Sequence, residues 1–463
     1  MKEMMTILKQ PRRLIGVFFL GLVLALPWAR AQAAHDIRGI TGPTFNLYAF
    51  PFNMNLPEGS SLQMWGFGDA DAGAGATHPE GAGYNLPQYP GPTLIVTEGE
   101  TVTINLQNLG VPQPVSIVVT GHNVNASGGS PGLVTQAANV GESVTYTFTA
   151  PEPGTYIYHS LDGSNPGLHV EMGLLGALIV RPANLIDTVS GKPTAYGDGT
   201  GTDYDQEFLS LLTEIDPEIH LQMERGHVQH FTNSDRFAKV WFVNGRVFPD
   251  LFQGDYNSLF PHQPYESLGQ AHPGDRVLVR QVNAGQDSHP FHFHGENHRF
   301  IARDGRMLSS DGVVANLGRS DNTINSAPKQ TIDAIWSWSG AELGWDIYGT
   351  GPGYQHTCNG LNVNQGPSAG FDPDTGEYCP DHGKAFPVTL PGAQDLSLGG
   401  WWSGSPFLGD VGDLPPGEGG LNPYGGYFLV WHSHAEKELT TFDIFPGGTL
   451  GAVVVLPPDV DIQ

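Results

Sequence analysis

The chain repeats one order of strand-like segments twice, and this repeat constrains its fold more than any other feature. Each copy contains a Gly-[Glu/Asp]-x-Val turn, a region with histidine, a [Tyr/Trp]-His-Ser segment and a closing apolar segment. The closing segments are 176–180 and 451–455. An internal repeat of this kind indicates two units with the same supersecondary structure.

Alternation of apolar and polar residues predicts β-strands inside each copy. Val102, Ile104 and Leu106 alternate with polar residues, so one face of that segment suits a core. The chain also has 62 glycines, 37 prolines and little helical periodicity, which favours strands joined by long loops. We therefore predict an all-β protein with two β-sandwich domains. The expected ranges are 35–182 for domain 1, 183–204 for a linker, and 205–463 for domain 2 with long loop insertions at about 300–424.

Residues 1–33 have the pattern of a signal peptide. A basic start that includes Arg12 and Arg13 precedes an apolar run at 17–26, and Ala31-Gln32-Ala33 has the form of a cleavage site. The apolar run is too short for a membrane anchor, so we expect no membrane span after cleavage. We predict export to the periplasm or the extracellular space. The arginine pair leaves twin-arginine and general export open.

Charge and cysteine content narrow the function. The formal net charge is −26, and removal of the basic signal segment makes it about −30. Such a surface argues against nucleic acid and anionic membranes as partners. The two cysteines, Cys358 and Cys379, lie in one Gly/Pro/Asp-rich stretch. In an exported protein they are expected to form a disulfide.

Two His-x-His motifs are the candidate metal-binding residues. His292 and His294 lie in His-Pro-Phe-His-Phe-His-Gly, and His432 and His434 lie in Trp-His-Ser-His. In a β-strand, residues two apart point to the same face, so each pair is expected to face one way. Imidazole suits copper, zinc, iron or nickel. The sequence alone leaves the metal open.

These motifs, together with 92–106, 154–180, 244–246, 282–295 and 431–448, resemble the two-domain multicopper oxidases and copper nitrite reductases. The resemblance implies two cupredoxin-like Greek-key sandwiches, copper as the cofactor, and a homotrimer with metal sites between subunits. It also implies that His122 and His159 of one subunit face His292, His294, His432 and His434 of its neighbour. Thr120 and Leu161 stand where two further ligands are expected, so the resemblance implies one or two copper ions per site, with zinc not excluded.

The chain departs from the family at the type 1 copper positions. Ser160 and Ser433 stand where the family has the cysteine ligand, and a hydroxyl does not replace a thiolate there. In domain 2, Glu438 and Asp443 replace the second histidine and the methionine, which leaves His289 without its partners. We therefore read His289 as a hydrogen-bonded core or surface histidine. In domain 1, the first expected histidine falls at Ile117 and the methionine Met172 lies two residues short, although His169 matches a type 1 position. We expect no type 1 copper in either domain.

Three functions remain open from the sequence. The first is an exported copper-binding oxidoreductase whose substrate reaches the metal directly. The second is a non-catalytic copper-binding or copper-handling protein, and the third is a metal-free structural homologue. An Asp-rich turn at 372–377 also has oxygen spacing like a calcium loop. The small-molecule substrate or electron donor cannot be read from the sequence.

Overall fold

The computed structural model describes residues 37–72, 86–161, 165, 167–227, 233–338, 427–456 and 460–462. The segment 1–33, both cysteines, the turn at 372–377 and most of the expected insertion lie outside the described residues. No helix within the described ranges is long and apolar enough to cross a membrane.

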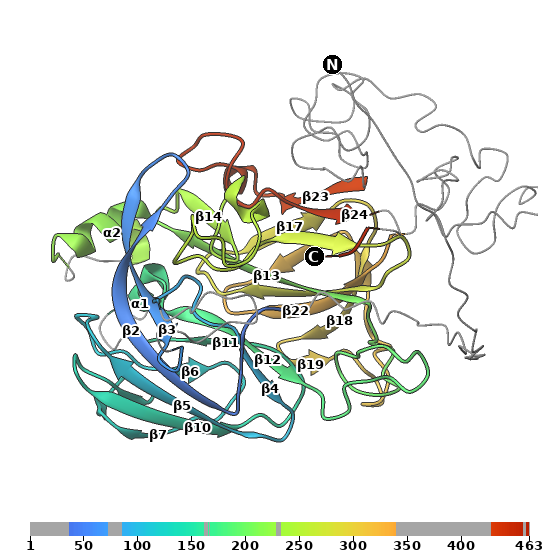
Figure 1. Ribbon diagram of the computed structural model, residues 1–463, viewed down its shortest axis with the longest axis horizontal. Helices are drawn as coiled ribbons and strands as arrows, with labels where there is room; N and C mark the ends of the chain where they lie inside the picture. Colours follow the sequence, from blue (N-terminus) through green and yellow to red (C-terminus); the bar gives the residue numbers. More distant parts are fainter. Residues whose placement is uncertain are drawn as a thin grey trace, which may run out of the picture. The chain divides into compact units, whose positions relative to one another are not determined.

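The first β-sandwich is built from two five-stranded sheets (Figure 1). One has the strand order β1-β4-β12-β11-β6 and the other the order β3-β2-β5-β10-β7. The bounds are β1 Ile40–Thr41, β2 Thr44–Asn55, β3 Ser61–Asp69, β4 Leu94–Thr97, β5 Thr101–Asn108, β6 Val118–Val119, β7 Asn125–Gly128, β10 Ser143–Thr149, β11 Gly154–His159 and β12 Leu175–Arg181. A small hairpin pairs β8 (Ser130–Pro131) with β9 (Gln136–Ala137), and the short helix α1 (Leu168–Met172) joins β11 to β12.

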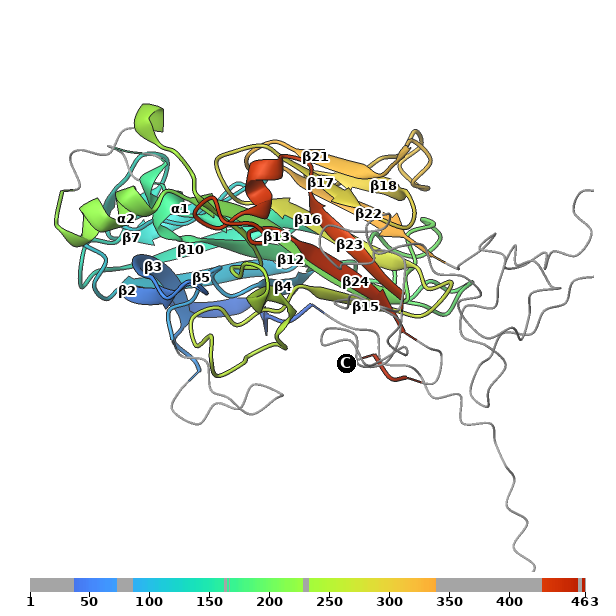
Figure 2. The same cartoon turned by 90° about the horizontal axis from the view of Figure 1, so that it is seen from above.

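The second β-sandwich has a sheet with the order β14-β13-β16-β22-β18-β19, with β20 paired to β18, and a sheet with the order β15-β24-β23-β17-β21. Figure 2 shows β21, β17, β23 and β24 side by side. The bounds are β13 Gln206–Ile215, β14 Val240–Val243, β15 Leu268–Ala271, β16 Val277–Asn283, β17 His289–Phe293, β18 His298–Arg303, β19 Arg306–Met307, β20 Ser320–Asp321, β21 Thr323–Ser326, β22 Thr331–Trp336, β23 Tyr427–Ser433 and β24 Gly451–Val455. The helices are α2 Pro217–Glu224, η2 Asn233–Asp235, η3 Asp250–Phe252 and η5 Glu436–Leu439.

Each sandwich has its own apolar core. The strands β5 and β10 alternate buried and exposed residues, as the sequence pattern predicted, because only one face of their sheet packs on the core. The all-β expectation is confirmed. Residues 300–338 were expected to begin the insertion, but they contribute strands β19 to β22. The 183–204 segment also packs on a sheet, since Tyr196 and Tyr204 share a buried cluster with Leu278.

A third apolar cluster joins the two sandwiches. It combines residues such as Leu175 and Ile179 of β12 with Leu211 of β13 and Val282 of β16. These strands are buried on both faces, so they lack the regular apolar–polar alternation of β5 and β10, and β12 is close to a continuous apolar run. The two sandwiches also meet where β11 lies beside β22 (Figure 1). There Thr331 Oγ1 donates to the Thr155 carbonyl at 2.7 Å.

Candidate metal centre

Four histidine rings converge at the ends of β17 and β23. The two strands pair antiparallel with His292 directly opposite His432. The pairing continues past both strand ends, because His294 N donates to the Val430 carbonyl at 3.0 Å and His434 N donates to the Pro290 carbonyl at 2.8 Å. The alternation of a strand therefore places all four rings on one face of the sheet.

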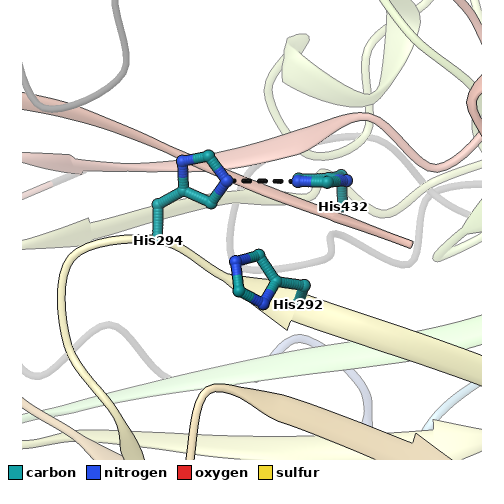
Figure 3. A group of neighbouring side chains, drawn as sticks. All are labelled: His292, His294 and His432. Atoms are coloured by element: carbon teal, nitrogen blue, oxygen red, sulfur yellow. Dashed lines mark hydrogen bonds between the residues drawn. The ribbon is translucent and has the colours of Figure 1, made fainter. Parts of the chain in front are cut away.

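The closest group consists of His292, His294 and His432 (Figure 3). One nitrogen from each ring lies within 4.8 Å of the others, and His294 Nε2 is 3.1 Å from His432 Nε2. The His434 ring centroid is 4.3 Å from that of His292, although His434 is more exposed and its nitrogens fall outside this closest group. Gly295 follows His294 with φ +97°, where a Cβ would lie 2.7 Å from Leu429 Cδ1. Only glycine permits this turn without strain.

Hydrogen bonds orient two of these rings. His292 Nδ1 lies 3.0 Å from Thr323 Oγ1, and His432 Nδ1 lies 2.9 Å from the Ser433 carbonyl. Since a carbonyl only accepts, His432 carries its proton on Nδ1 and presents an unprotonated Nε2. A ring held in this way through one nitrogen offers the other nitrogen as a ligand.

The surroundings of His292, His294 and His432 keep these three rings neutral. Burial, followed by repulsion from the neighbouring rings, lowers the pKa of His292 and of His294 to about 4. Burial also lowers the pKa of His432. These imidazoles keep their lone pairs at neutral pH, and neutral imidazole is the form that binds a metal ion.

His122 and His159 lie in the first sandwich, apart from this cluster. His159 ends β11 and is buried; burial and then the positive charge of Lys329 lower its pKa to about 4. His122 follows β6, and its Nδ1 donates to the Thr120 carbonyl at 2.9 Å. Its Nε2 is buried against Phe148 and Tyr156 and has no hydrogen-bond partner within the described residues. Within one chain, no group of three potential ligands among the described residues includes either histidine.

His289 lies on the opposite face of β17, between the two sheets of the second sandwich. Its Nε2 is 2.9 Å from Glu214 Oε2 and its Nδ1 is 2.8 Å from Glu438 Oε2. Burial alone lowers the pKa of such a ring, but the hydrogen bonds and charges of Glu214 and Glu438 raise it to about 10. His289 is thus a charged core histidine with both nitrogens occupied, in agreement with the hydrogen-bonded reading of the sequence.

The corresponding residues of the first sandwich form a hydrogen-bond network around His169 that contains no carboxylate. Ser160 Oγ accepts from Ser116 N at 2.9 Å and lies 2.7 Å from His169 Nδ1. His169 Nε2 lies 3.0 Å from Gln113 Oε1, which accepts. When the ring is neutral, the serine hydroxyl donates to Nδ1 and Nε2–H donates to the amide oxygen. Met172, expected near this position, belongs to the apolar core.

A second set of buried charges was not anticipated from the sequence. Arg236 bridges Glu171 of α1, at 2.6 Å, and Glu214 of β13, at 2.7 Å, so it ties the first sandwich to the second (Figure 2 shows α1 near β13). The only sequence signal was a glutamate within an apolar run at 208–215. A buried carboxylate needs a partner, but the run does not say which residue supplies it.

Comparison with known proteins places these residues in a family context. Residues 73–185 match the family model described as multicopper oxidase. A probable nitrite reductase–hydroxylamine oxidoreductase fusion protein of Kuenenia stuttgartiensis is 28% identical over 342 residues, which cover 70% of this chain and 32% of that protein. A copper-containing nitrite reductase of Cereibacter sphaeroides is 26% identical over 264 residues, covering 56% of this chain and 61% of that protein. An L-ascorbate oxidase of Brassica rapa subsp. pekinensis is 32% identical over 164 residues, 34% of this chain and 26% of that protein. The chain thus spans less than two thirds of the length of each of these relatives.

Solved structures support the fold. A blue copper oxidase from Nitrosomonas europaea superimposes with a TM-score of 0.50 at 16% identity, covering 89% of this chain and 85% of that chain. A multicopper oxidase, mgLAC, superimposes with a TM-score of 0.52 at 16% identity, covering 91% and 87%. At this identity the likeness concerns the fold alone, and it confirms the expected cupredoxin-like sandwiches.

Proposed function

Since the chain is a relative of the multicopper oxidases and copper nitrite reductases, we propose that it is a copper-binding protein whose metal site is the histidine cluster of the second sandwich. The observation that carries this proposal is the convergence of His292, His294 and His432, with His434 beside them. Uncharged imidazoles facing one another in this way are a donor set suited to copper or zinc. The names of the relatives favour copper.

The site takes one or two copper ions. His292 and His432 each have Nδ1 held by the chain, so their Nε2 atoms would be the ligands, together with His294. His434 is placed to complete the set. Bound copper supplies one-electron exchange, while the chain positions the rings and keeps them unprotonated.

We also propose that neither sandwich holds a type 1 copper. That site requires a thiolate, and the residues in its place are already engaged with one another. In the second sandwich both nitrogens of His289 bind carboxylates. In the first, both nitrogens of His169 bind neutral polar groups. A metal would have to displace two hydrogen bonds at each position without gaining a sulfur ligand.

The remaining histidines point to an assembly. His122 and His159 lie in the first sandwich and do not join the cluster within one chain, so we propose that they approach the cluster of a neighbouring subunit in a homotrimer. His122 would have to turn for its buried Nε2 to reach a shared metal. Export to the periplasm or the extracellular space, with a Cys358–Cys379 disulfide, completes the proposal.

As an activity, we propose an oxidoreductase in which a small-molecule substrate or electron donor meets the metal directly, because no thiolate links the site to an electron-accepting copper. The occupied type 1 positions favour a second candidate, a copper-binding or copper-handling protein without turnover. A metal-free structural homologue is the third candidate, and the neutral, converging imidazoles argue against it.

Metal analysis of the purified protein, made metal-free and reconstituted with Cu(II), tests the proposal. We expect one or two copper ions per subunit, an EPR spectrum of nitrogen-coordinated Cu(II), and no intense blue absorption. Less than one copper per subunit would refute the copper site, and an intense blue band would refute the absence of type 1 copper. His292→Ala should abolish binding. Oxidase and nitrite reductase assays of wild-type and His292→Ala protein then separate an enzyme from a copper-handling protein, since only an enzyme loses turnover with its metal.

A further inference from the structure

The first residue of β17 is held from two directions. His289 points between the two sheets, whereas His292 points to the outer face with the cluster. The two ring nitrogens of His289 bind Glu214 and Glu438, which come from different secondary-structure elements. We call these three residues the carboxylate clamp.

Glu214 joins the clamp to the opposite sheet. It lies on β13 and is fully buried. While its Oε2 binds His289, its Oε1 accepts from Gln286 N at 2.7 Å and from Asp287 N at 3.0 Å, and it also binds Arg236. One carboxylate thereby fixes both the turn before β17 and the first residue of the strand.

Glu438 joins the clamp to the other histidine strand. It lies on η5, which follows β23 after only two residues. Its own main chain is fixed, because the Glu438 carbonyl accepts from Thr449 N at 2.8 Å and from Thr449 Oγ1 at 3.1 Å. The clamp therefore connects the start of β17 to the segment that leaves β23, in addition to the ladder between the strands.

The register of these two strands decides whether the cluster exists. His292 lies opposite His432, and a shift of one residue would turn one of these rings to the other face of the sheet. The ladder between β17 and β23 joins three residue pairs and continues in one hydrogen bond past each strand end, and β21 pairs with the other edge of β17. Neighbouring imidazoles gain little from one another when no metal is bound, so the clamp adds an anchor that the backbone ladder alone does not supply.

We propose that His289 is a positioning residue, which fixes the register of β17 against β23 through Glu214 and Glu438 and so assembles the histidine cluster before metal binds. This inference rests on the proposed function, because it assigns His289 a role at the copper site. Lys329, Arg236, Glu171 and Asp287 also carry charge around the clamp. None of them binds His289, and the role assigned here depends on hydrogen-bond geometry.

The test compares three variants of the full chain. Glu438→Ala removes one arm of the clamp, and Glu438→Gln keeps an amide oxygen that accepts from His289. Arg181→Gln is the matched control, since Arg181 makes a buried ion pair with Glu207 in the contact between the sandwiches and its other hydrogen bond goes to Tyr204. Two quantities are measured: the Cu(II) dissociation constant by calorimetric titration, and amide deuterium uptake of 289–294 in metal-free protein by mass spectrometry.

For Glu438→Ala we expect Cu(II) affinity to fall on the order of tenfold or more, as for other residues that orient metal ligands, and uptake in 289–294 to rise. Glu438→Gln should bring both values back toward those of wild type, because its amide oxygen still accepts from His289 Nδ1, and Arg181→Gln should change neither while lowering the melting temperature. Wild-type affinity and uptake in Glu438→Ala would overturn the proposal, as would an equal effect of Arg181→Gln. If the wild-type protein binds no copper, the copper site fails and the uptake data alone decide the role of the clamp.

Discussion

Replacing Glu438 with glutamine should lower stability in a manner that depends on pH. In the folded protein the pKa of His289 is about 10, compared with 6.5 for an unperturbed ring. A group with a raised pKa contributes stability that is fully present below the unfolded pKa and is lost as the pH rises through the folded pKa. The contribution of His289 is therefore complete below about pH 6.5 and gone above about pH 10. At about 1.4 kcal/mol per pH unit it amounts to about 5 kcal/mol.

The two carboxylates share this effect, since each binds one nitrogen of the ring at nearly the same distance. Removing one charge should lower the pKa of His289 by roughly half of the difference. Glu438→Gln is then expected to be less stable than wild type by about 2–3 kcal/mol at pH 7, and by less than about 1 kcal/mol at pH 10, where the ring is largely neutral in both proteins. This narrowing difference is the signature of a charged clamp.

The comparison between variant and wild type is needed because other groups titrate in the same range. Burial lowers the pKa of Lys329 to about 8, so its contribution rises with pH between about 8 and 10.5 and opposes that of His289. The lowered pKa values of His159, His292 and His294, each about 4, make stability rise between about pH 4 and 6.5. All four contributions cancel in the difference.

The difference in the free energy of unfolding between Glu438→Gln and wild type is measured by guanidinium unfolding of metal-free protein, followed by tryptophan fluorescence at pH 7, 8, 9 and 10. Tyr196→Phe serves as the control, because it removes a 2.6 Å hydrogen bond to Asp333, which is buried, pairs with Arg280 and does not contact the clamp. Its cost should be about 1–3 kcal/mol and nearly constant from pH 7 to 9, and it should fall only slightly at pH 10, where a tyrosine of the unfolded chain begins to ionise. A difference for Glu438→Gln that stays constant from pH 7 to 10, or that is absent at pH 7, would show that His289 is not a charged partner of Glu438.

Three further predictions concern single positions. Gly285→Ala would place a Cβ 2.0 Å from a carboxylate oxygen of Glu214, so thermal denaturation should show a stability loss of about 2–3 kcal/mol. Gly254→Ala is the control: no atom lies within 4 Å of its Cβ, so its stability should stay within about 0.5 kcal/mol of wild type. Equal losses in the two variants would contradict the packing argument. Ser433→Cys should not produce intense blue absorption after copper addition, since both nitrogens of His289 are bound to carboxylates. A blue band would mean that the clamp opens for metal. His434→Ala should weaken Cu(II) binding less than His292→Ala in a calorimetric titration, because only the latter belongs to the closest group of nitrogens; the reverse order would reassign the ligands.

Much of the fold could be predicted because its signals are local. The alternation along 101–106 and 144–148 marks strands with one buried face, and the structure has β5 and β10 there. The same periodicity predicted that His292 and His294 share a face, as they do. The strands β19, β20 and β21 were missed because each has at most four residues, and β22 was missed because the buried Asp333 interrupts its apolar residues.

The site could be predicted only in part. Two His-x-His motifs identify rings that can converge, but the distance between Nε2 atoms depends on how β17 pairs with β23, and no local pattern encodes that register. Only one of the two partners of His289 could be noted from the sequence. Glu438 was noted as a substitution at a ligand position, whereas Glu214 lies 75 residues away and meets His289 through packing of one sheet on the other. Such pairs are properties of tertiary structure.

The apolar contact between the two sandwiches has a consequence for how the molecule melts. Strands β12, β13 and β16 have no face left for water, because the outer sheet of each sandwich covers one side and the partner sandwich covers the other. Separation of the halves would expose Leu175, Ile179, Leu211 and Val282 together. Neither half is then a stable folding unit by itself, and heating should give a single calorimetric transition in which both halves unfold at one temperature. A protease cut in the 183–204 connection would leave two fragments that still elute as one particle.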